Sequence, residues 1–327
     1  MDHVGAAGRL HLDFAGDRVR ALRMDDRSLR RSQKQGSAVR VRRGVYASAA
    51  EWRSASSCDR HIAQIIAVAA TRHGVVVGYE SAAAFWGFPR LGHWPSEVQL
   101  VSRPGSGAHS RAGVREHRVA LPDDDVVEVD GIRITTPART LIDVARSGST
   151  LDAVVMIDHA LNPMVCHLPV TVEQRELLEL AGDRVGRRGR SRVLAAIGAS
   201  RVGSANPGET WGRLLIERFG MPEPCLQVQH VNPRGGFYYT DFEWPELSII
   251  GEFDGRSKYL KPEYLGALTP GEAVVAEKIR EDHLRLEGSR VVRWMFDGLR
   301  DPSRLRDILT AVGVPARRAR ESHARRA

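Results

Sequence analysis

Apolar and polar positions alternate with two different periods along the chain, and the last third shows both most clearly. Segments in which apolar residues recur every three or four positions predict helices, and segments in which they alternate with polar residues predict strands. The predicted order there is a helix at Pro207–Phe219, strands at Leu226–Val231, Phe237–Glu243 and Leu247–Asp254, a helix at Pro270–Glu287 and a strand at Arg290–Phe296. The pattern therefore predicts an α-β-β-β-α-β domain over residues 201–310.

The two middle strands of this domain form a hairpin. We place its turn at Pro245-Glu246, because proline presets a turn and cannot donate to a central ladder. This hairpin puts Asp241 opposite, or nearly opposite, Glu252, and the two-residue period of a strand puts Asp254 on the same face as Glu252. Buried carboxylates are costly unless they are paired or bind a cation. The acids thus allow two interpretations: a divalent-metal site, or a hairpin whose acids are solvated or paired with arginine.

Residues 1–50 alternate between helix and strand patterns. Ala15–Arg23 predicts a short helix, and Arg27–Gln35 predicts a second one after an aspartate cap. Val39–Tyr46 alternates as a pair of strands does. Helix, turn, basic helix and basic β-wing is the plan of a winged helix-turn-helix, which binds DNA. The alternative is a small basic subdomain that packs on the rest of the chain.

Positive charge is dense in this first block. From Arg23 to Arg43 the chain has eight basic and two acidic residues, and this clustering favours binding of double-stranded DNA. The predicted DNA-binding residues lie on the second helix and the wing: Arg27, Arg30, Arg31, Lys34, Arg40, Arg42 and Arg43.

Residues 51–200 predict a mixed α+β block. Cys58–His73 has a helical apolar stripe, Asp130-Gly131 is a strong hairpin turn, and Thr136-Pro137 begins another helix with threonine as its cap. The block holds no catalytic constellation, and its scattered histidines fit surface or packing positions. We interpret it as a scaffold that positions the DNA-binding end. The whole chain is thus predicted to be an α+β protein of several domains.

Composition extends this picture. The chain has 327 residues, a net charge of +8 and a pI of about 9.8, and only four of its 48 basic residues are lysine. Arginine suits phosphate and base-edge contacts. The three cysteines lack zinc spacing and predict reduced thiols, with Cys166 and Cys225 buried. No apolar run approaches the roughly 20 residues of a transmembrane helix, and no signal-peptide core begins the chain, so we expect a cytoplasmic protein without a membrane partner. Residues 311–327 predict a basic disordered tail.

The segment from Ala15 to Tyr46, which ends in Arg43-Gly44-Val45-Tyr46, resembles the winged-helix domain of AbiEi-type antitoxins and related actinobacterial regulators. Tyr79–Ala83 and Thr136–Asp143 resemble the middle region of AbiEi-like proteins. The resemblance implies a domain that binds promoter DNA, and a gene paired with a nucleotidyltransferase-like toxin as a partner. One departure is the turn Arg23-Met24-Asp25, where the family often has glycine.

The order α-β-β-β-α-β resembles the restriction-endonuclease-like, or PD-(D/E)XK, fold, and the pattern Asp-Phe…Glu-x-Asp-Gly resembles Vsr-like domains of unknown function. The resemblance implies that Asp241 and Glu252 hold Mg²⁺ and that Glu209 on the first helix orients the hydrated metal. It also implies that the metal activates water at a scissile phosphate.

One departure from this family bears on function. The family motif has lysine two residues after the (D/E) position, and this chain has Asp254 there. A catalytic cation would then come from Lys258 or Lys278, or Asp254 would be a further metal ligand.

The sequence therefore supports two hypotheses. The first is a Mg²⁺-dependent DNA endonuclease of Vsr-like type, with Glu209, Asp241, Glu252, Asp254 and Lys258 as catalytic residues and the metal at Asp241, Glu252 and Asp254. The alternative is a non-enzymatic transcriptional regulator or antitoxin that carries a degenerate nuclease fold.

Overall fold

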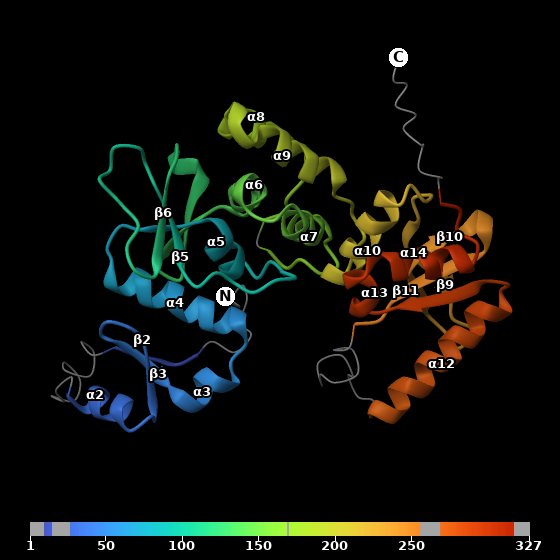
Figure 1. Ribbon diagram of the computed structural model, residues 1–327, viewed down its shortest axis with the longest axis horizontal. Helices are drawn as coiled ribbons and strands as arrows, with labels where there is room; N and C mark the ends of the chain where they lie inside the picture. Colours follow the sequence, from blue (N-terminus) through green and yellow to red (C-terminus); the bar gives the residue numbers. More distant parts are fainter. Residues whose placement is uncertain (1–9, 15–26, 169, 256–268, 317–327) are drawn as a thin grey trace, which may run out of the picture. The chain divides into compact units, whose positions relative to one another are not determined.

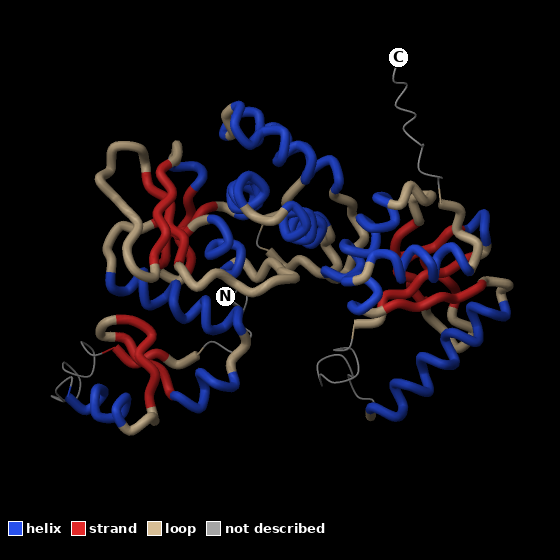
Figure 2. The backbone as a smooth tube through the Cα atoms, in the orientation of Figure 1, coloured by secondary structure: helices blue, strands red, loops and turns tan. Residues whose placement is uncertain are grey.

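The structure is a computed structural model that describes residues 10–14, 27–168, 170–255 and 269–316 (Figure 1, Figure 2). The chain separates into two compact units, Met1–Ser200 and Arg201–Ala327. Residues 1–50 and 51–200 thus lie within one unit. The predicted helix Ala15–Arg23 and Lys258 lie outside the described residues. Within the described ranges, no helix combines the length and the apolar character needed to cross a membrane.

The described N-terminal part of the first unit combines helix α2 with a three-stranded antiparallel sheet. Helix α2 (Arg27–Lys34) is followed by strands β2 (Ala38–Arg42) and β3 (Val45–Ser48), and β3 lies between β2 and β1 (Leu12–Phe14). Gly44, in the β2–β3 turn, has a φ of +79°, which glycine adopts without strain. The predicted basic helix and strand pair are confirmed.

The rest of the first unit is a mixed five-stranded sheet with helices packed around it, in the strand order β6-β5-β4-β8-β7. The strands are β4 (Val76–Val77), β5 (Val98–Ser102), β6 (Val114–Arg118), β7 (Val126–Val129) and β8 (Ile132–Thr135). The helices are α3 (Ala49–Ser54), α4 (Ser57–Thr71), α5 (Tyr79–Phe85), η1 (Asp123–Asp125), α6 (Pro137–Ser147), α7 (Thr150–Leu161), α8 (Gln174–Arg184) and α9 (Arg187–Ala199). Helix α4 lies between this sheet and the N-terminal sheet and contacts both β2 and β5 (Figure 1).

A buried arginine joins three elements of this unit. The guanidinium of Arg139, on α6, donates to Asp143 one turn later (2.9 Å) and to Asp125 of η1 (2.5 Å). Arg184 of α8 pairs with the same Asp125 (3.1 Å). Burial raises the pKa of Asp143 to about 6, although Arg139 opposes this shift. Because loss of Arg139 would leave buried carboxylates without this cation, the cluster holds η1, α6 and α8 together.

The second unit is a four-stranded sheet in the order β12-β11-β10-β9 with helices on both faces (Figure 1). Its elements are α10 (Pro207–Arg218), β9 (Cys225–Val231), β10 (Phe237–Trp244), η2 (Pro245–Leu247), β11 (Ile249–Phe253), α12 (Pro270–Leu286), β12 (Arg290–Trp294), α13 (Phe296–Arg300) and α14 (Pro302–Ala311). Strands β9 to β11 form an antiparallel meander, and β12 pairs in parallel with β11. The predicted α-β-β-β-α-β order and the proline turn are confirmed.

The two faces of this sheet differ in chemistry. One face packs on α10, α13 and α14 through a buried apolar core that includes Phe242, Trp244, Ile249, Phe253 and Trp294. Since side chains alternate along a strand, Asp241 and Glu252 project from the opposite face, which α12 covers. The fold therefore brings Asp241 and Glu252 to one place, beneath α12.

The predictions for the start of the tail and for two of the cysteines are wrong. Residues 311–314 are not part of a tail, because α14 continues to Ala311 and the side chain of Val314 is buried in the same core. Cys225 is exposed because it begins an edge strand, and Cys166 is only half-buried. Residues 317–327 of the predicted tail lie outside the described residues.

Helices α10 and α12 both begin with Pro-Gly-Glu, which supplies a matched pair of glycines. A Cβ atom at Gly208 would overlap the ring of Phe253, whereas a Cβ atom at Gly271 would meet nothing within 4 Å. We expect Gly208→Ala to lower the free energy of unfolding by about 1–3 kcal/mol and Gly271→Ala to change it by less than about 0.5 kcal/mol. Urea unfolding followed by tryptophan fluorescence measures both, and equal effects would contradict this packing.

Candidate functional site

Four of the predicted DNA-binding residues line one cleft between α2 and the β2–β3 hairpin. The cleft has a volume of about 590 Å³ and is lined by Arg30, Gln33, Lys34, Arg40, Arg43, Gly44 and Tyr46. Arg30 and Lys34 share a face of α2 because they lie one turn apart, and the hairpin contributes Arg40 and Arg43. All four residues are exposed, and the described lining contains no carboxylate. The cleft, which we call the basic cleft, is therefore positive and open to water.

The other three predicted residues lie elsewhere. Arg42 is half-buried and lines a second cavity, because a register shift between Arg40 and Arg42 interrupts the regular alternation of β2. Arg31 is exposed on α2 but does not line the basic cleft, and Arg27 is the first residue of α2. Four of the seven predicted DNA-binding residues thus lie together in the basic cleft, and Arg42 lines a different cavity.

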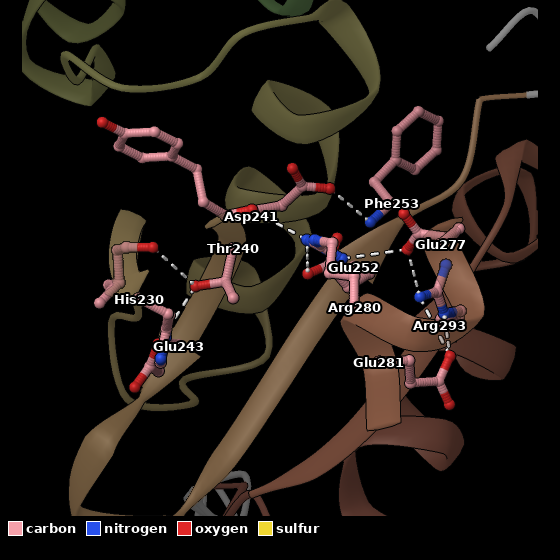
Figure 3. Close-up of polar contacts among 12 residues, drawn as sticks. His230, Thr240, Asp241, Glu243, Glu252, Phe253, Glu277, Arg280, Glu281 and Arg293 are labelled. Carbon is pink, nitrogen blue, oxygen red and sulfur yellow. Dashed lines mark hydrogen bonds and ion pairs between the residues drawn. The ribbon is translucent and has the colours of Figure 1, made fainter. Parts of the chain in front are cut away.

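Asp241 and Glu252 lie together in the second unit, as the sequence predicts (Figure 3). The β10–β11 register pairs Phe242 with Gly251, which sets Asp241 across from Glu252. Both are buried, with exposed fractions of 6% and 4%. Burial, together with the neighbouring charge of Asp241, raises the pKa of Glu252 to about 8. Two carboxylates so close and so buried require a positive partner or hydrogen-bond donors.

Arginine and the backbone supply these partners. Arg280 of α12 donates to Glu252 (2.7 Å) and to the carbonyl oxygen of Tyr239 (2.8 Å). Asp241 accepts the backbone N–H of Phe253 (2.8 Å), which fixes it to the adjacent strand. The acids on the sheet are therefore already engaged by groups of the chain itself.

The same charge network continues along β12. Arg293 pairs with Asp254 (3.3 Å) and with Glu281 of α12 (3.1 Å). Glu277 of α12 lies between the two arginines, at 3.0 Å from Arg280 and 2.6 Å from Arg293 (Figure 3). These carboxylates raise the pKa of Arg293, so its guanidinium stays charged. We call the set Asp241, Glu252, Asp254, Glu277, Arg280, Glu281 and Arg293 the arginine–acid cluster.

Glu209, the third acid expected at a metal site, engages the start of α10. Its carboxylate accepts the N–H of Ala205 (2.6 Å) and the side-chain amides of Asn206 and Gln227. Gln227 has a φ of +50° where the β9–β10 pairing is interrupted. Glu272, in the equivalent place of α12, accepts the backbone N–H of Thr269, the residue directly before its helix. Helix capping thus accounts for an acid at this position.

The residues around the acids do not fit a Mg²⁺ site. Within the described part of the chain, no three His, Cys, Asp or Glu side chains form a group that could hold a metal ion. Mg²⁺ requires oxygen ligands in near-octahedral geometry, whereas Glu252 and Asp254 each face a guanidinium. Lys278, an alternative catalytic cation, is exposed on α12. This arrangement supports no metal-dependent step.

The sequence pattern did not identify Arg280 and Arg293 as the partners of the acids. One signal was available for Arg293, because a β-α-β connection predicts parallel pairing of β11 with β12, and this pairing sets Arg293 beside Glu252. Whether Arg280 faces the acids depends on the rotation of α12 about its own axis, and the helical pattern of the sequence does not determine that rotation.

Comparison with known proteins bears mainly on the first unit. The family model described as the AbiEi antitoxin C-terminal domain matches residues 43–194, from the β2–β3 turn into α9. This match supports the AbiEi-type resemblance of the middle region. The match begins after α2 and β2, so it includes Arg43 but not the other residues predicted to bind DNA.

The chain is also similar to two proteins of Mycobacterium tuberculosis, "Uncharacterized protein MT2308" of strain CDC 1551 / Oshkosh and "Uncharacterized protein Rv2248" of strain ATCC 25618 / H37Rv. Each is 27% identical over 281 residues, which covers 83% of this chain and 91% of the relative. Because the first unit ends at Ser200, a likeness of this extent continues into the second unit.

The buried Glu252 implies a pH dependence of stability. Its pKa is about 8 in the folded chain, against an ordinary value of about 4.3 in an unfolded one, so the folded state binds more protons between these values. We expect the free energy of unfolding to fall as the pH rises from about 5 to about 8, by at most about 1.4 kcal/mol per pH unit from this group, and to level off above. Urea unfolding across this pH range measures the slope.

Two substitutions isolate the contribution of Glu252. Glu252→Gln removes the titrating group and keeps its shape. The free energy of unfolding of this variant should therefore lack the part of the pH dependence that Glu252 contributes to the wild type. Glu246→Gln, on the exposed turn η2, should retain the wild-type slope. An unchanged slope in Glu252→Gln would show that another group titrates.

Proposed function

We propose that the chain is a DNA-binding regulator of the antitoxin type and that the basic cleft is its contact with double-stranded DNA. One observation carries the proposal: Arg30, Lys34, Arg40 and Arg43 converge on a cleft whose described lining has no carboxylate. The match to the AbiEi antitoxin C-terminal domain, which begins at Arg43, supports the assignment to a regulator.

The chemistry of the basic cleft suits DNA. Arginine and lysine neutralise backbone phosphates and release counterions, which supplies affinity without regard to sequence. Gln33 lies among these cations on α2, and glutamine can read adenine through two hydrogen bonds in the major groove. In this proposal α2 enters the major groove and the β2–β3 hairpin contacts the neighbouring backbone.

A protein partner follows from the same family likeness. Since an antitoxin acts on a toxin, we propose a cognate toxin as the partner of this chain and the cytoplasm, where its DNA lies, as the place of action. The support is the match over residues 43–194.

The second unit has no catalytic role in this proposal. A metal-dependent endonuclease needs carboxylates that are available to the metal, and here Arg280 and Arg293 engage Glu252 and Asp254. We therefore propose that the arginine–acid cluster stabilises the fold of this unit. The Mg²⁺-dependent endonuclease remains the competing hypothesis.

The DNA contact is tested by fluorescence anisotropy with a labelled duplex from the gene's own upstream region. The double variant Arg30→Gln/Lys34→Gln should weaken binding, and the slope of log K against log salt should become less steep by about 0.9 for each phosphate that the variant no longer neutralises. The control Arg175→Gln/Arg306→Gln removes the same charge from exposed residues that do not line the basic cleft, and should bind within about twofold of the wild type. Equal weakening in both variants would contradict the assignment of the cleft.

The same titration tests the partner. The purified product of the adjacent gene is added to the chain bound to its duplex, and a further rise in anisotropy indicates a complex of all three. If size-exclusion chromatography detects no complex with that protein, the toxin part of the proposal fails and the DNA part stands.

Cleavage is tested on supercoiled plasmid with Mg²⁺ or Mn²⁺. We expect no nicking, because the acids that would bind the metal are engaged by arginine. Asp241→Ala and Glu252→Ala are assayed beside the wild type. Nicking by the wild type that both substitutions abolish would restore the endonuclease hypothesis.

A further inference from the structure

A second cavity lies between strand β2, helix α4, the first residue of β5 and the residues just before β6. Its volume is about 320 Å³, and it is lined by Arg40, Val41, Arg42, Arg43, Gln64, Val68, Ser96, Val98, Ala112 and Gly113. The polar part of this lining consists of guanidinium, amide and hydroxyl groups, and the described lining holds no carboxylate. Every charged side chain in the described lining is therefore positive.

Arg42 shows the electrostatic consequence. It is half-buried, and its pKa is lowered by burial and by the nearby positive charge of Arg72. Both effects disfavour the charged form of the side chain. The buried Arg139 and the half-buried Arg293 differ from Arg42, because carboxylates beside them raise their pKa values. Arg42 is thus a cation in an environment that favours the arrival of an anion.

We propose that this cavity binds a phosphate group, held by the Arg42 guanidinium and by Arg40 and Arg43 at the cavity's border with the basic cleft. Guanidinium groups recognise phosphate oxygens through paired N–H donors, and the Gln64 amide offers a further donor. The phosphate belongs either to a small phosphorylated molecule or to the DNA backbone. The second source rests on the proposed function, whereas the first does not.

Because the two cavities share arginines, a ligand in one should affect binding in the other. Arg40 and Arg43 line both cavities, while Arg30 and Lys34 line only the cleft and Arg42 lines only the second cavity. A free phosphate that engages Arg40 and Arg43 would withdraw them from DNA, so its binding should oppose DNA binding. The two ligands would then weaken each other to the same extent.

The test uses the full chain, inorganic pyrophosphate as the free probe and the labelled duplex as the second probe. Ser96→Glu places a carboxylate in the cavity, and Ser96→Gln is the neutral control of similar size. Calorimetric titration should show that Ser96→Glu and Arg42→Gln bind pyrophosphate at least about tenfold more weakly than the wild type. Ser96→Gln and Arg30→Gln/Lys34→Gln should stay within about twofold, because the cavity keeps its charge in both.

The outcomes separate the two sources. Pyrophosphate binding that Ser96→Glu weakens and Ser96→Gln preserves supports a free phosphorylated ligand, and it does not depend on DNA binding. If pyrophosphate does not bind but Ser96→Glu weakens duplex binding about tenfold relative to Ser96→Gln, the cavity takes a backbone phosphate. Equal behaviour of the two Ser96 variants toward both probes overturns the proposal. Failure of the proposed function appears separately, as an absence of duplex binding by the wild type.

Discussion

A buried carboxylate requires a positive or hydrogen-bonding partner, and this requirement organises both units of the chain. In the first unit Arg139 of α6 meets Asp125 of η1, and in the second unit Arg280 of α12 meets Glu252 of β11. Removal of one member of such a pair leaves a buried charge alone, which typically costs about 3–5 kcal/mol. Each pair therefore fixes how a helix lies against its neighbours. Arginine is the cation in both places, so part of the arginine-rich composition is structural.

The arginines of the β2–β3 hairpin stand in the opposite situation. Arg40 and Arg43 are exposed. Burial and the positive charge of Arg72 lower the pKa of Arg42, and the described lining of its cavity contains no carboxylate. A net charge of +8 on the whole chain does not by itself distinguish these residues from the paired ones. Their surroundings do, because cations that line a cavity without a carboxylate in its described lining attract an anion from outside the chain. The charge that supports the proposed ligand binding is therefore local to the hairpin.

The sequence predicted the second unit largely because its helical and strand periods are strong and a proline marks the turn before Ile249. The position of Asp241 across from Glu252 followed from that turn alone. Other features depend on long-range packing, which the periodicity of the sequence does not predict. The hydrogen bond from Arg280 to Glu252, for example, depends on how α12 packs on the sheet. Helix α7 was not predicted because residues 152–158 are all buried, which leaves no polar face to reveal a period. The sequence left a metal site and pairing with arginine both open, and the structure pairs Glu252 with Arg280 and Asp254 with Arg293.

Binding and cleavage of a phosphodiester place opposite demands on charge. Binding requires cations that the protein has left available, whereas metal-dependent cleavage requires carboxylates that it has left available. In the second unit Arg280 and Arg293 engage the acids of the sheet, and in the first unit the cavity beside Arg42 offers cations without carboxylates in its described lining. This distribution of ion pairs supports the proposal that the chain binds phosphate at the hairpin and α2 rather than hydrolysing it in the second unit.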